Sequence, residues 1–442
     1  MDKKYTLPSG CACGRTHEAA LEDVLIGSGV IRRLPELLKK YGCQKPFLLS
    51  GHDTFAAAGR PVCSALDEAG LSCSRFVFPH SPVLPTEQSV GSAAMHFDAS
   101  CDAIVSIGSG VINDIGKILA AISKKPYLIV ATAPSMDGYA SATSSMERDG
   151  LKVSINTVCA RAVLGDTDIL CQAPMRMLQS GVGDMLAKYV SLAEWQLGKI
   201  IVGEYYCPEV AQMVRRALEQ VVSAADGLVK REKQAVQSVM EGLVIAGLCM
   251  QYAGLSRPAS GIEHYFSHIW DMRALAFPDA KADLHGIQCG AATVLSLRVC
   301  ERLKAVTPDK QKALRYASSF GIESWYEQLG SFIGPGAQAM IALDRQEGKY
   351  EPKAHEKRLE RIVSHWDEIL SVLDSLPAAS EIERLLRSIG APTDAGEWGY
   401  TPEQLRKTFT MTKDIRDKYI VSRLLWDLGE LDQTADALFY RP

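Results

Sequence analysis

The first part of the chain alternates two hydrophobic patterns. Short apolar runs rich in β-branched and aromatic residues are followed by longer segments whose apolar residues recur every three or four positions. The runs are typical of buried strands, and the longer segments are typical of amphipathic helices. Strands that alternate with helices predict a parallel, doubly wound sheet. We expect strands at residues 24–27, 47–50, 75–78, 103–107 and 127–132.

The segment that follows these strands has a different pattern. Residues 142–163 contain β-branched stretches around 152–155 and 162–163. Such stretches predict a hairpin, which we expect at the edge of the sheet.

From about Pro174 a helical period replaces the alternation almost throughout. It is carried by residues 175–197, 209–229, 233–253 and 286–302, and charged amphipathic segments continue over 305–442, with Pro/Gly breaks at 334–336, 351–352 and 390–392. These patterns predict an α/β domain over residues 1–165 and an all-helical domain over residues 166–442. The cleft between two such domains is the expected active site.

Composition narrows the possible functions. The chain has 442 residues, which suffices for two domains, and its net charge of −4 gives no bulk attraction to nucleic acid. No apolar run reaches the length of a membrane span, and the opening Met-Asp-Lys-Lys-Tyr lacks an apolar leader segment. We therefore expect a cytoplasmic protein without nucleic-acid or membrane partners.

Twelve cysteines are scattered without regular spacing, which fits reduced thiols better than a disulfide framework. The exception is the segment Cys11-Ala-Cys13-Gly-Arg-Thr-His17. Its two cysteines are closer together than is usual for structural zinc, and no second Cys/His pair follows nearby. We expect an ordered N-terminal loop there, with a metal knuckle as the alternative.

Two polar loops follow neighbouring expected strands. Gly108-Ser109-Gly110 separates a strand from a helix, so backbone N–H groups at the helix start could meet a phosphate. The next strand ends in a polar loop over residues 133–141. Ligands of open α/β sheets bind at these strand ends. Asp53 follows an early strand, where a carboxylate either binds a ribose hydroxyl or caps the next helix.

Potential metal ligands lie in three segments of the helical half. Asp184 stands beside glycines, His264 and His268 are four residues apart on one predicted helix face, and His285 precedes Gly286. One carboxylate with two imidazoles is a usual donor set for a catalytic divalent ion. Each residue also has a simpler interpretation: Asp184 as a helix N-cap, His285 as a capping or packing residue, and the other two histidines as a surface pair. We expect Glu263 to be a solvated or salt-bridged neighbour.

In combination these motifs resemble the superfamily of iron-containing alcohol dehydrogenases, glycerol dehydrogenases and dehydroquinate synthases. Within it, the chain is most similar to the sn-glycerol-1-phosphate dehydrogenase family, in its bacterial form associated with arabinose operons. The motifs that carry the resemblance are Gly108–Lys117, Thr132–Ser141, Gly183–Lys188, Gly261–His268, Leu284–Gly286 and the N-terminal Cys-x-Cys segment. Ser109 stands where the family usually has a glycine.

The resemblance implies an N-terminal dinucleotide-binding domain and a helical domain that binds metal and substrate. The divalent metal would be held by Asp184, His264 and His285. The substrate would be touched by Asp137, His268 and the shared Asp184. The dinucleotide would be held by Asp53, Gly110, Val111, Ile112, Asn113, Asp114, Thr132, Ala133, Pro134, Ser135 and Ser141. The resemblance is less clear after Arg302, so it leaves the role of residues 413–416 and of Tyr419 open.

The activity that the resemblance implies is hydride transfer from NADH or NADPH to dihydroxyacetone phosphate, giving sn-glycerol 1-phosphate for glycerophospholipid synthesis. The metal would polarise the ketone as a Lewis acid. Zinc, nickel and iron all suit the donor set. A dehydroquinate synthase-like lyase, which normally has Glu as the metal carboxylate, and a glycerol dehydrogenase remain alternatives. We expect a homo-oligomer, with a dimer favoured.

Overall fold

The computed structural model describes residues 3–7 and 10–440, and the chain divides into two compact units, each built from two stretches. The first unit comprises Met1–Met185 and Glu209–Ser256, and the second comprises Leu186–Pro208 and Arg257–Pro442. The sequence predicts a single boundary at residue 165, whereas the units interleave across it. The helices α8 (Pro208–Val229) and α9 (Lys233–Ala253) fall in the unit that contains the sheet.

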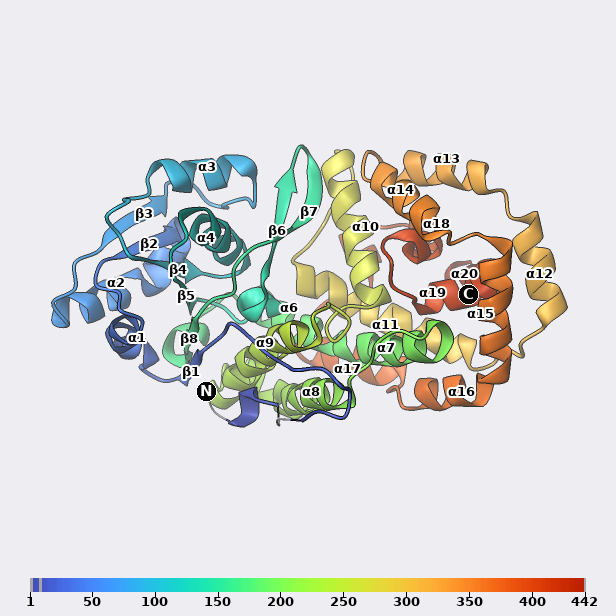
Figure 1. Cartoon of the computed structure of the whole chain (residues 1–442), viewed down its shortest axis with the longest axis horizontal. Coiled ribbons are helices and arrows are strands. Elements are labelled where there is room, and N and C mark those ends of the chain that lie inside the picture. The colour runs from blue at the N-terminus through green and yellow to red at the C-terminus, as the bar shows by residue number, and fades with distance from the viewer. Residues whose placement is uncertain (1–2, 8–9, 441–442) are drawn as a thin grey trace. The chain divides into compact units, whose positions relative to one another are not determined.

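The first unit contains a parallel six-stranded sheet with the order β1-β8-β5-β4-β2-β3 (Figure 1). Its strands are β1 (Asp23–Gly27), β2 (Pro46–Gly51), β3 (Ser74–Phe78), β4 (Ala103–Gly108), β5 (Tyr127–Ala131) and β8 (Ala162–Asp166). The five strands expected from the apolar runs are confirmed to within one or two residues at each end. The α/β class is confirmed as well.

The sixth strand corrects the hairpin prediction. The hairpin exists, but β6 (Thr143–Arg148) and β7 (Leu151–Asn156) form a two-stranded sheet of their own. Residues 162–166 leave the hairpin and pair with both β1 and β5 inside the main sheet. The cause is burial, since every residue of β8 is buried whereas β7 is partly exposed along its length.

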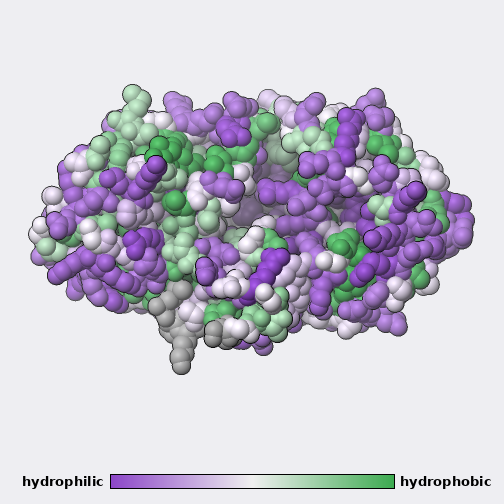
Figure 2. All heavy atoms as spheres, viewed as in Figure 1, coloured by the Kyte–Doolittle hydropathy of each residue, from purple (hydrophilic) through white to green (hydrophobic). Residues whose placement is uncertain are grey.

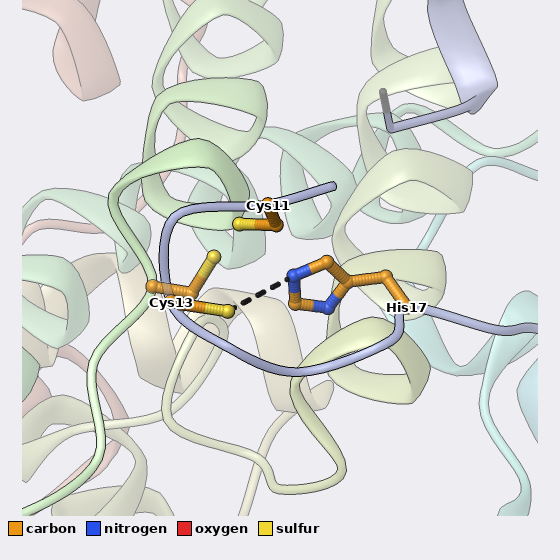
Figure 3. Close-up of side chains that lie close together, drawn as sticks. Cys11, Cys13 and His17 are labelled. Carbon is orange, nitrogen blue, oxygen red and sulfur yellow. Dashed lines mark hydrogen bonds between the residues drawn. The ribbon is translucent and has the colours of Figure 1, made fainter. Parts of the chain in front are cut away.

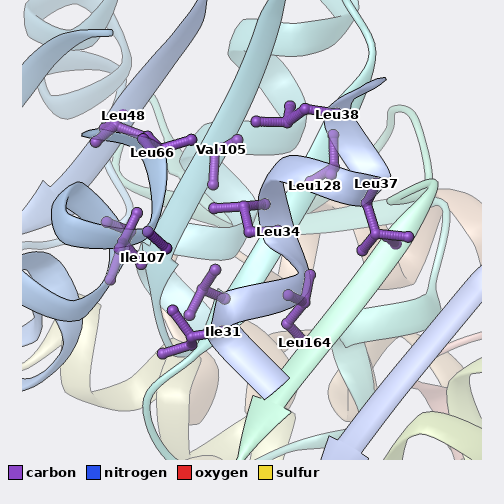
Figure 4. Packing of buried hydrophobic residues seen from close by; sticks show 14 of the residues in the cluster. Ile31, Leu34, Leu37, Leu38, Leu48, Leu66, Val105, Ile107, Leu128 and Leu164 are labelled. Carbon is purple, nitrogen blue, oxygen red and sulfur yellow. The ribbon is translucent and has the colours of Figure 1, made fainter. Parts of the chain in front are cut away.

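One face of the sheet is covered by η2 (Val30–Arg33), α1 (Leu34–Lys40) and α2 (His52–Glu68). The register aligns Leu48 with Val105, and Val105 with Leu128, so alternate side chains of neighbouring strands form one apolar layer. Leu34 and Leu66 pack onto that layer from the helices (Figure 4). Burial of these side chains is the main driving force for this half of the fold.

The opposite face carries α4 (Gly110–Ser123), with α3 (Glu87–Met95) beside it. Tyr127 of β5 donates its hydroxyl to the side chain of Asn113 on α4, at 3.0 Å. Since helices cover both faces, the four inner strands are buried throughout, and their ends are left to meet a ligand.

The remaining helices of the first unit are α5 (Thr167–Leu170), α6 (Met175–Leu186), α8 and α9. The predicted helix 175–197 is in fact two helices, because α6 ends at Leu186 and α7 (Lys188–Val202) starts after Ala187. The helix predicted at 233–253 is confirmed at both ends.

The second unit is helical, and no strand occurs in its described residues. Besides α7 it contains α10 (Ile262–Ala276), α11 (His285–Leu303), α12 (Lys310–Ser319), α13 (Ile322–Ile333), α14 (Ala337–Glu347), α15 (Pro352–Ser364), α16 (Trp366–Asp374), α17 (Ala379–Ser388), α18 (Pro402–Met411), α19 (Val421–Asp427) and α20 (Leu431–Phe439). The predicted breaks at 334–336, 351–352 and 390–392 coincide with helix ends or starts.

A buried ionic cluster holds the C-terminal helices of this unit together. Asp414 pairs with Lys413 and Arg423 and accepts a hydrogen bond from Trp325 Nε1 at 2.7 Å. Lys413 also lies 3.6 Å from the centre of the Trp325 ring. Tyr419 donates its hydroxyl to Asp427 at 2.8 Å. The side chains of Lys413 and Tyr419, whose role the sequence leaves open, therefore form stabilising contacts within this unit.

Hydrophilic residues dominate the face shown in Figure 2, where apolar residues gather only in small groups. None of the described helices combines the length and the apolar character that a bilayer-spanning segment needs.

Candidate active site

The glycine-rich turn connects the end of β4 to the start of α4. Ser109 is the N-cap residue of α4, but its side chain makes no capping hydrogen bond. Its Oγ lies 2.5 Å from Ser135 Oγ and accepts a hydrogen bond from the Tyr139 hydroxyl at 3.2 Å. The N–H groups of the first turn, from Gly110 to Ile112, are therefore not capped by that side chain. An uncapped helix N-terminus of this kind favours a bound phosphate.

The sheet topology places a second loop beside this turn. β2 and β4 are neighbours, but the chain leaves β2 toward β3 and leaves β4 toward β5, so their connections diverge. Ligands of open α/β sheets bind at such a switch point, outside the carboxyl ends of the strands. The loop after β2 contributes Asp53, which is exposed in the first turn of α2.

The structure excludes the N-cap interpretation of Asp53, because the N-cap of α2 is Gly51. Asp53 instead accepts a hydrogen bond from Ser81 Oγ at 2.5 Å and contacts His52. These two contacts, the Ser81 bond first, lower the pKa of the Asp53 carboxyl. Asp53 is therefore an exposed carboxylate at the switch point, where it could accept hydrogen bonds from ribose hydroxyls.

Lys117 is a buried cation that the sequence analysis did not assign to the site. Its Nζ donates to the carbonyls of Gly138 at 2.6 Å and Thr143 at 2.9 Å, and it contacts Ser141 Oγ at 3.1 Å. Asn113 donates to the same Gly138 carbonyl at 3.1 Å. These side chains fix η3 (Asp137–Ala140) against α4. Asn113 and Ser141 thus shape the loop through bonds within the protein.

Loop 132–135 is buried and forms hydrogen bonds with both the end of β4 and α6. Thr132 N donates to Gly108 O at 3.0 Å, and Ser180 Oγ donates to Ser135 O at 2.8 Å. Gly181 permits this contact, because a Cβ there would lie 2.0 Å from the carbonyl oxygen of Pro134. The close approach positions Asp184, which lies one turn further along α6.

Asp184 is fully buried and lies in the last turn of α6, so the N-cap interpretation is wrong. Its carboxylate accepts a hydrogen bond from the backbone N–H of Asp137 at 2.9 Å. The carboxylates of Asp184 and Asp137 have oxygens within 4.8 Å of each other. Paired carboxylates at this spacing favour a cation or a hydrogen-bond donor between them.

In the second unit, His264 lies in the first turn of α10 and is 5% exposed, which excludes a surface pair. Its Nδ1 lies 2.8 Å from Glu263 Oε1. Because a carboxylate only accepts, Nδ1 carries the proton and the lone pair of a neutral ring is on Nε2. A carboxylate behind the imidazole is the usual support for a metal-binding histidine. The Glu263–His264 pair therefore fits a metal site.

Glu263 itself differs from the prediction of a solvated neighbour, because it is fully buried. It also accepts the backbone N–H of Gly261 at 2.6 Å. Glu194 on α7 accepts the N–H groups of Ile262 and Val421, each at 2.8 Å. Burial, reinforced by the nearby charge of Glu263, raises the pKa of Glu194 to about 8. The start of α10 thus rests on two buried carboxyl groups.

His285 is the first residue of α11, and the centres of its ring and that of His264 are 5.0 Å apart. Its Nδ1 lies 3.1 Å from Ser267 Oγ. Gln288 donates to the same Ser267 hydroxyl at 3.2 Å. The two imidazoles are therefore close together, and each has a partner that fixes its orientation. His268 is half-buried one turn beyond His264 on α10.

Cys289 is a further residue that the sequence reasoning did not assign to the site. Its Sγ lies 3.6 Å from His285 Nε2, and both groups have donor atoms within 4.8 Å of one on His264. The four-residue spacing from His285 on a helix was the available signal. For Glu263, the only signal was that it adjoins a histidine.

Comparisons with known proteins identify the relatives of this chain. Residues 25–174 match the family described as iron-containing alcohol dehydrogenase. A protein of Halalkalibacterium halodurans named glycerol-1-phosphate dehydrogenase (NAD(P)+) is 28% identical, over 88% of this chain and 88% of its own. A protein of the same name from Bacillus velezensis is 31% identical over 67% of this chain and 77% of its own.

A solved structure supports the fold alone. Sulfoacetaldehyde reductase from Bifidobacterium kashiwanohense, in complex with NAD+, superposes with a TM-score of 0.62 at 15% identity, covering 97% of this chain and all of that one. The 31% sequence identity shows the family as well as the fold. The chain belongs to the glycerol-1-phosphate dehydrogenase family among the iron-containing alcohol dehydrogenases.

Proposed function

We propose that this chain is an NAD(P)-dependent and metal-dependent oxidoreductase that reduces dihydroxyacetone phosphate to sn-glycerol 1-phosphate. The reaction consumes one NADH or NADPH and one proton, and its product feeds glycerophospholipid synthesis. The observation that carries the proposal is the contact of His264 Nδ1 with the buried Glu263, which leaves Nε2 as a metal donor. The substrate follows from the relatives, which are named glycerol-1-phosphate dehydrogenase (NAD(P)+).

The cofactor is assigned to the strand ends of the first unit. The uncapped N-terminus of α4, from Gly110 to Ile112, would bind the pyrophosphate, and Asp53 would bind the adenosine ribose. Loop 132–135 would lie along the nicotinamide side. The remaining cofactor residues, Asn113, Asp114 and Ser141, would act mainly by holding that loop and the start of α4.

The divalent metal is assigned to Asp184, His264 and His285. A fully buried carboxylate and two oriented imidazoles are the donor types that zinc, nickel and iron share. When bound, the cation withdraws charge from the C2 oxygen of the substrate, and the nicotinamide supplies hydride to C2.

The substrate is assigned to Asp137 and His268. Asp137 lies beside Asp184, where its carboxylate would accept a hydrogen bond from a substrate hydroxyl. His268, one turn beyond a metal ligand, would deliver a proton to the alkoxide through water or a substrate hydroxyl. The chain is further proposed to act in the cytoplasm as a homodimer.

One experiment separates this function from its alternatives. Metal-reconstituted protein is offered NADH or NADPH with dihydroxyacetone phosphate, dihydroxyacetone and, in reverse, glycerol, and the product enantiomer is determined. We expect net NAD(P)H consumption with dihydroxyacetone phosphate and formation of sn-glycerol 1-phosphate. Preference for unphosphorylated substrates would identify a glycerol dehydrogenase. A dehydroquinate synthase-like lyase would show no net NADH consumption.

A further inference from the structure

The N-terminal segment brings three metal-binding side chains together outside the site described above. Cys11, Cys13 and His17 each have a donor atom within 4.8 Å of the others (Figure 3). In Figure 3 the imidazole and the Cys13 thiol point toward each other across the loop. The sequence predicts an ordered loop here, and the structure adds that the loop gathers its donors at one point.

The loop has the backbone geometry of a tight knuckle. Gly14 N donates to Cys11 O at 3.1 Å, which closes a turn around Cys13. Gly14 has a φ of +78°, a conformation that side chains disfavour, so glycine is required directly after the second cysteine. The turn places the two thiols on the same side of the chain as His17.

The orientation of the histidine points to a metal. His17 Nδ1 lies 2.8 Å from the carbonyl oxygen of Tyr252. Because a carbonyl only accepts, Nδ1 carries the proton and Nε2 presents its lone pair. Nε2 lies 3.3 Å from Cys13 Sγ. Two donors of a tetrahedral zinc, with Zn–S of about 2.3 Å and Zn–N of about 2.0 Å, lie roughly 3.5 Å apart.

The segment is also attached to the first unit on both sides of these donors. Ala20 N donates to Gln251 Oε1 at 3.0 Å, and the Tyr252 hydroxyl donates to Tyr5 O at 2.7 Å. Both partners lie at the end of α9, the helix that packs on η3, where Asp137 is located. A metal bound in the loop would therefore stiffen a segment that contacts α9, the helix that holds η3 and Asp137 in place.

We propose that Cys11 Sγ, Cys13 Sγ and His17 Nε2 bind a zinc ion with a structural role. Two thiolates balance the charge of the cation, and the two thiol protons are released on binding. Thiolate and imidazole together select zinc over magnesium or calcium. A fourth donor completes the tetrahedron, and the experiment below identifies it. The proposal is independent of the proposed function, because none of these residues belongs to the Asp184, His264 and His285 set.

The test is a metal count on the full chain, purified with and without zinc, together with the spectrum of the cobalt-substituted protein. We expect a zinc ion per chain that survives His264→Ala and is lost in the double variant Cys11→Ser, Cys13→Ser. Cobalt in the loop should give sulfur-to-metal charge-transfer absorption that the double variant lacks. Cys63→Ser, which changes a half-buried cysteine elsewhere in the first unit, is the matched control and should keep both signals. Single replacement of each remaining cysteine then identifies any thiol that supplies the fourth donor.

Two results would overturn the proposal. One is an unchanged metal count and cobalt spectrum in the double variant. The other is a reduced wild-type protein that binds no metal beyond the ion lost in His264→Ala, which would leave the contact between Cys13 and His17 as a simple hydrogen bond. As a second readout, zinc should raise the thermal unfolding temperature of the wild type and of the Cys63→Ser control, but not that of the double variant.

Discussion

Two clusters in this protein combine histidine with cysteine, and they differ in what lies behind the imidazole. At the N-terminus the His17 Nδ1 proton is bound by the neutral carbonyl of Tyr252. At the start of α10 the His264 Nδ1 proton is bound by the buried carboxylate of Glu263. The first cluster supplies two thiols from its own loop, whereas the second offers one thiol, Cys289, beside two imidazoles.

This difference fits the two proposed roles, a structural site in the N-terminal loop and a catalytic site at α10 and α11. Thiolates supply the negative charge that a structural ion needs, so a neutral partner behind the histidine is sufficient. Neutral imidazoles bring no charge to a metal, so the charge in the proposed catalytic set comes from Asp184. A carboxylate behind the ring makes Nε2 of His264 more basic without occupying a coordination position. A position is then left for a substrate oxygen, which a Lewis-acid reaction requires.

The largest effect is expected for His264→Ala. The variant removes a proposed ligand of the catalytic metal, whose charge stabilisation is worth several kcal/mol, so kcat/KM should fall by on the order of 10³-fold. Metal analysis should show loss of the ion assigned to this site, while any thiolate-bound zinc remains. Intact metal content with near-normal turnover would contradict the ligand assignment. His365→Ala, at a half-buried histidine of the same unit that the site does not include, is the control and should leave both unchanged.

A smaller effect is expected for Glu263→Gln, which keeps the size of the side chain but removes its charge. If the carboxylate acts by supporting His264, metal affinity should fall by about 10- to 100-fold. Titration with zinc or nickel against a competing chelator measures the change, and excess metal should restore most of the activity. If restored metal binding brought no activity back, Glu263 would have a role other than supporting the ligand.

The sequence predicts the helices, strands and turns of the protein better than it predicts which charged side chains are buried. The α4 turn and the strands around it follow from local patterns, because alternating burial and helical spacing are properties of short segments. Local motifs also mark Asp184, His264 and His285 as potential ligands, whereas their assignment to one metal comes from the family resemblance and stays a prediction. The role of Glu263 was missed, because a charged residue is expected at the surface unless its partner is known.

The remaining errors come from contacts between distant segments. Residues 162–166 look like the end of a hairpin, yet they pair with β1 and β5 because both of their faces are buried by other parts of the first unit. The helices α8 and α9 join the sheet-containing unit across a boundary that no local pattern marks. The same reason applies to the N-terminal loop, where Tyr252 orients His17 from a point far along the chain.

A pH effect on stability is expected from the buried carboxyl group of Glu194. The raised pKa of Glu194, about 8, means that the folded protein holds a proton there from about pH 4.5 to 8 that the unfolded chain releases. Its stabilising contribution is therefore complete below about pH 4.5 and is lost as the pH rises through about 8. Between pH 5 and 8 the free energy of unfolding should fall by on the order of 3 kcal/mol from this group.

Urea unfolding of chelator-treated protein across this pH range measures the effect, and Glu194→Gln should flatten the decline. The exposed Glu327→Gln in the same unit is the control and should keep the slope of the wild type. An identical slope in Glu194→Gln and wild type would show that Glu194 is ionised in the folded protein.

The smallest effect is expected for Cys289→Ala, and it tests whether the thiol near His285 is a ligand. Its Sγ lies 3.6 Å from His285 Nε2, a spacing that fits either a bound metal or a weak contact within α11. We assign the catalytic metal to the carboxylate and the two imidazoles, because a fourth strong donor from the protein would occupy the position that the substrate oxygen needs. Turnover in Cys289→Ala should then stay within about threefold of the wild type, which corresponds to ~0.6 kcal/mol.

Cobalt bound to the Cys11→Ser, Cys13→Ser variant should likewise show no sulfur-to-metal charge transfer. If that absorption appeared and then vanished on adding Cys289→Ala, the α11 cluster would contain a thiolate ligand, and the contrast between the two sites would have to be drawn from the carboxylate behind His264 alone.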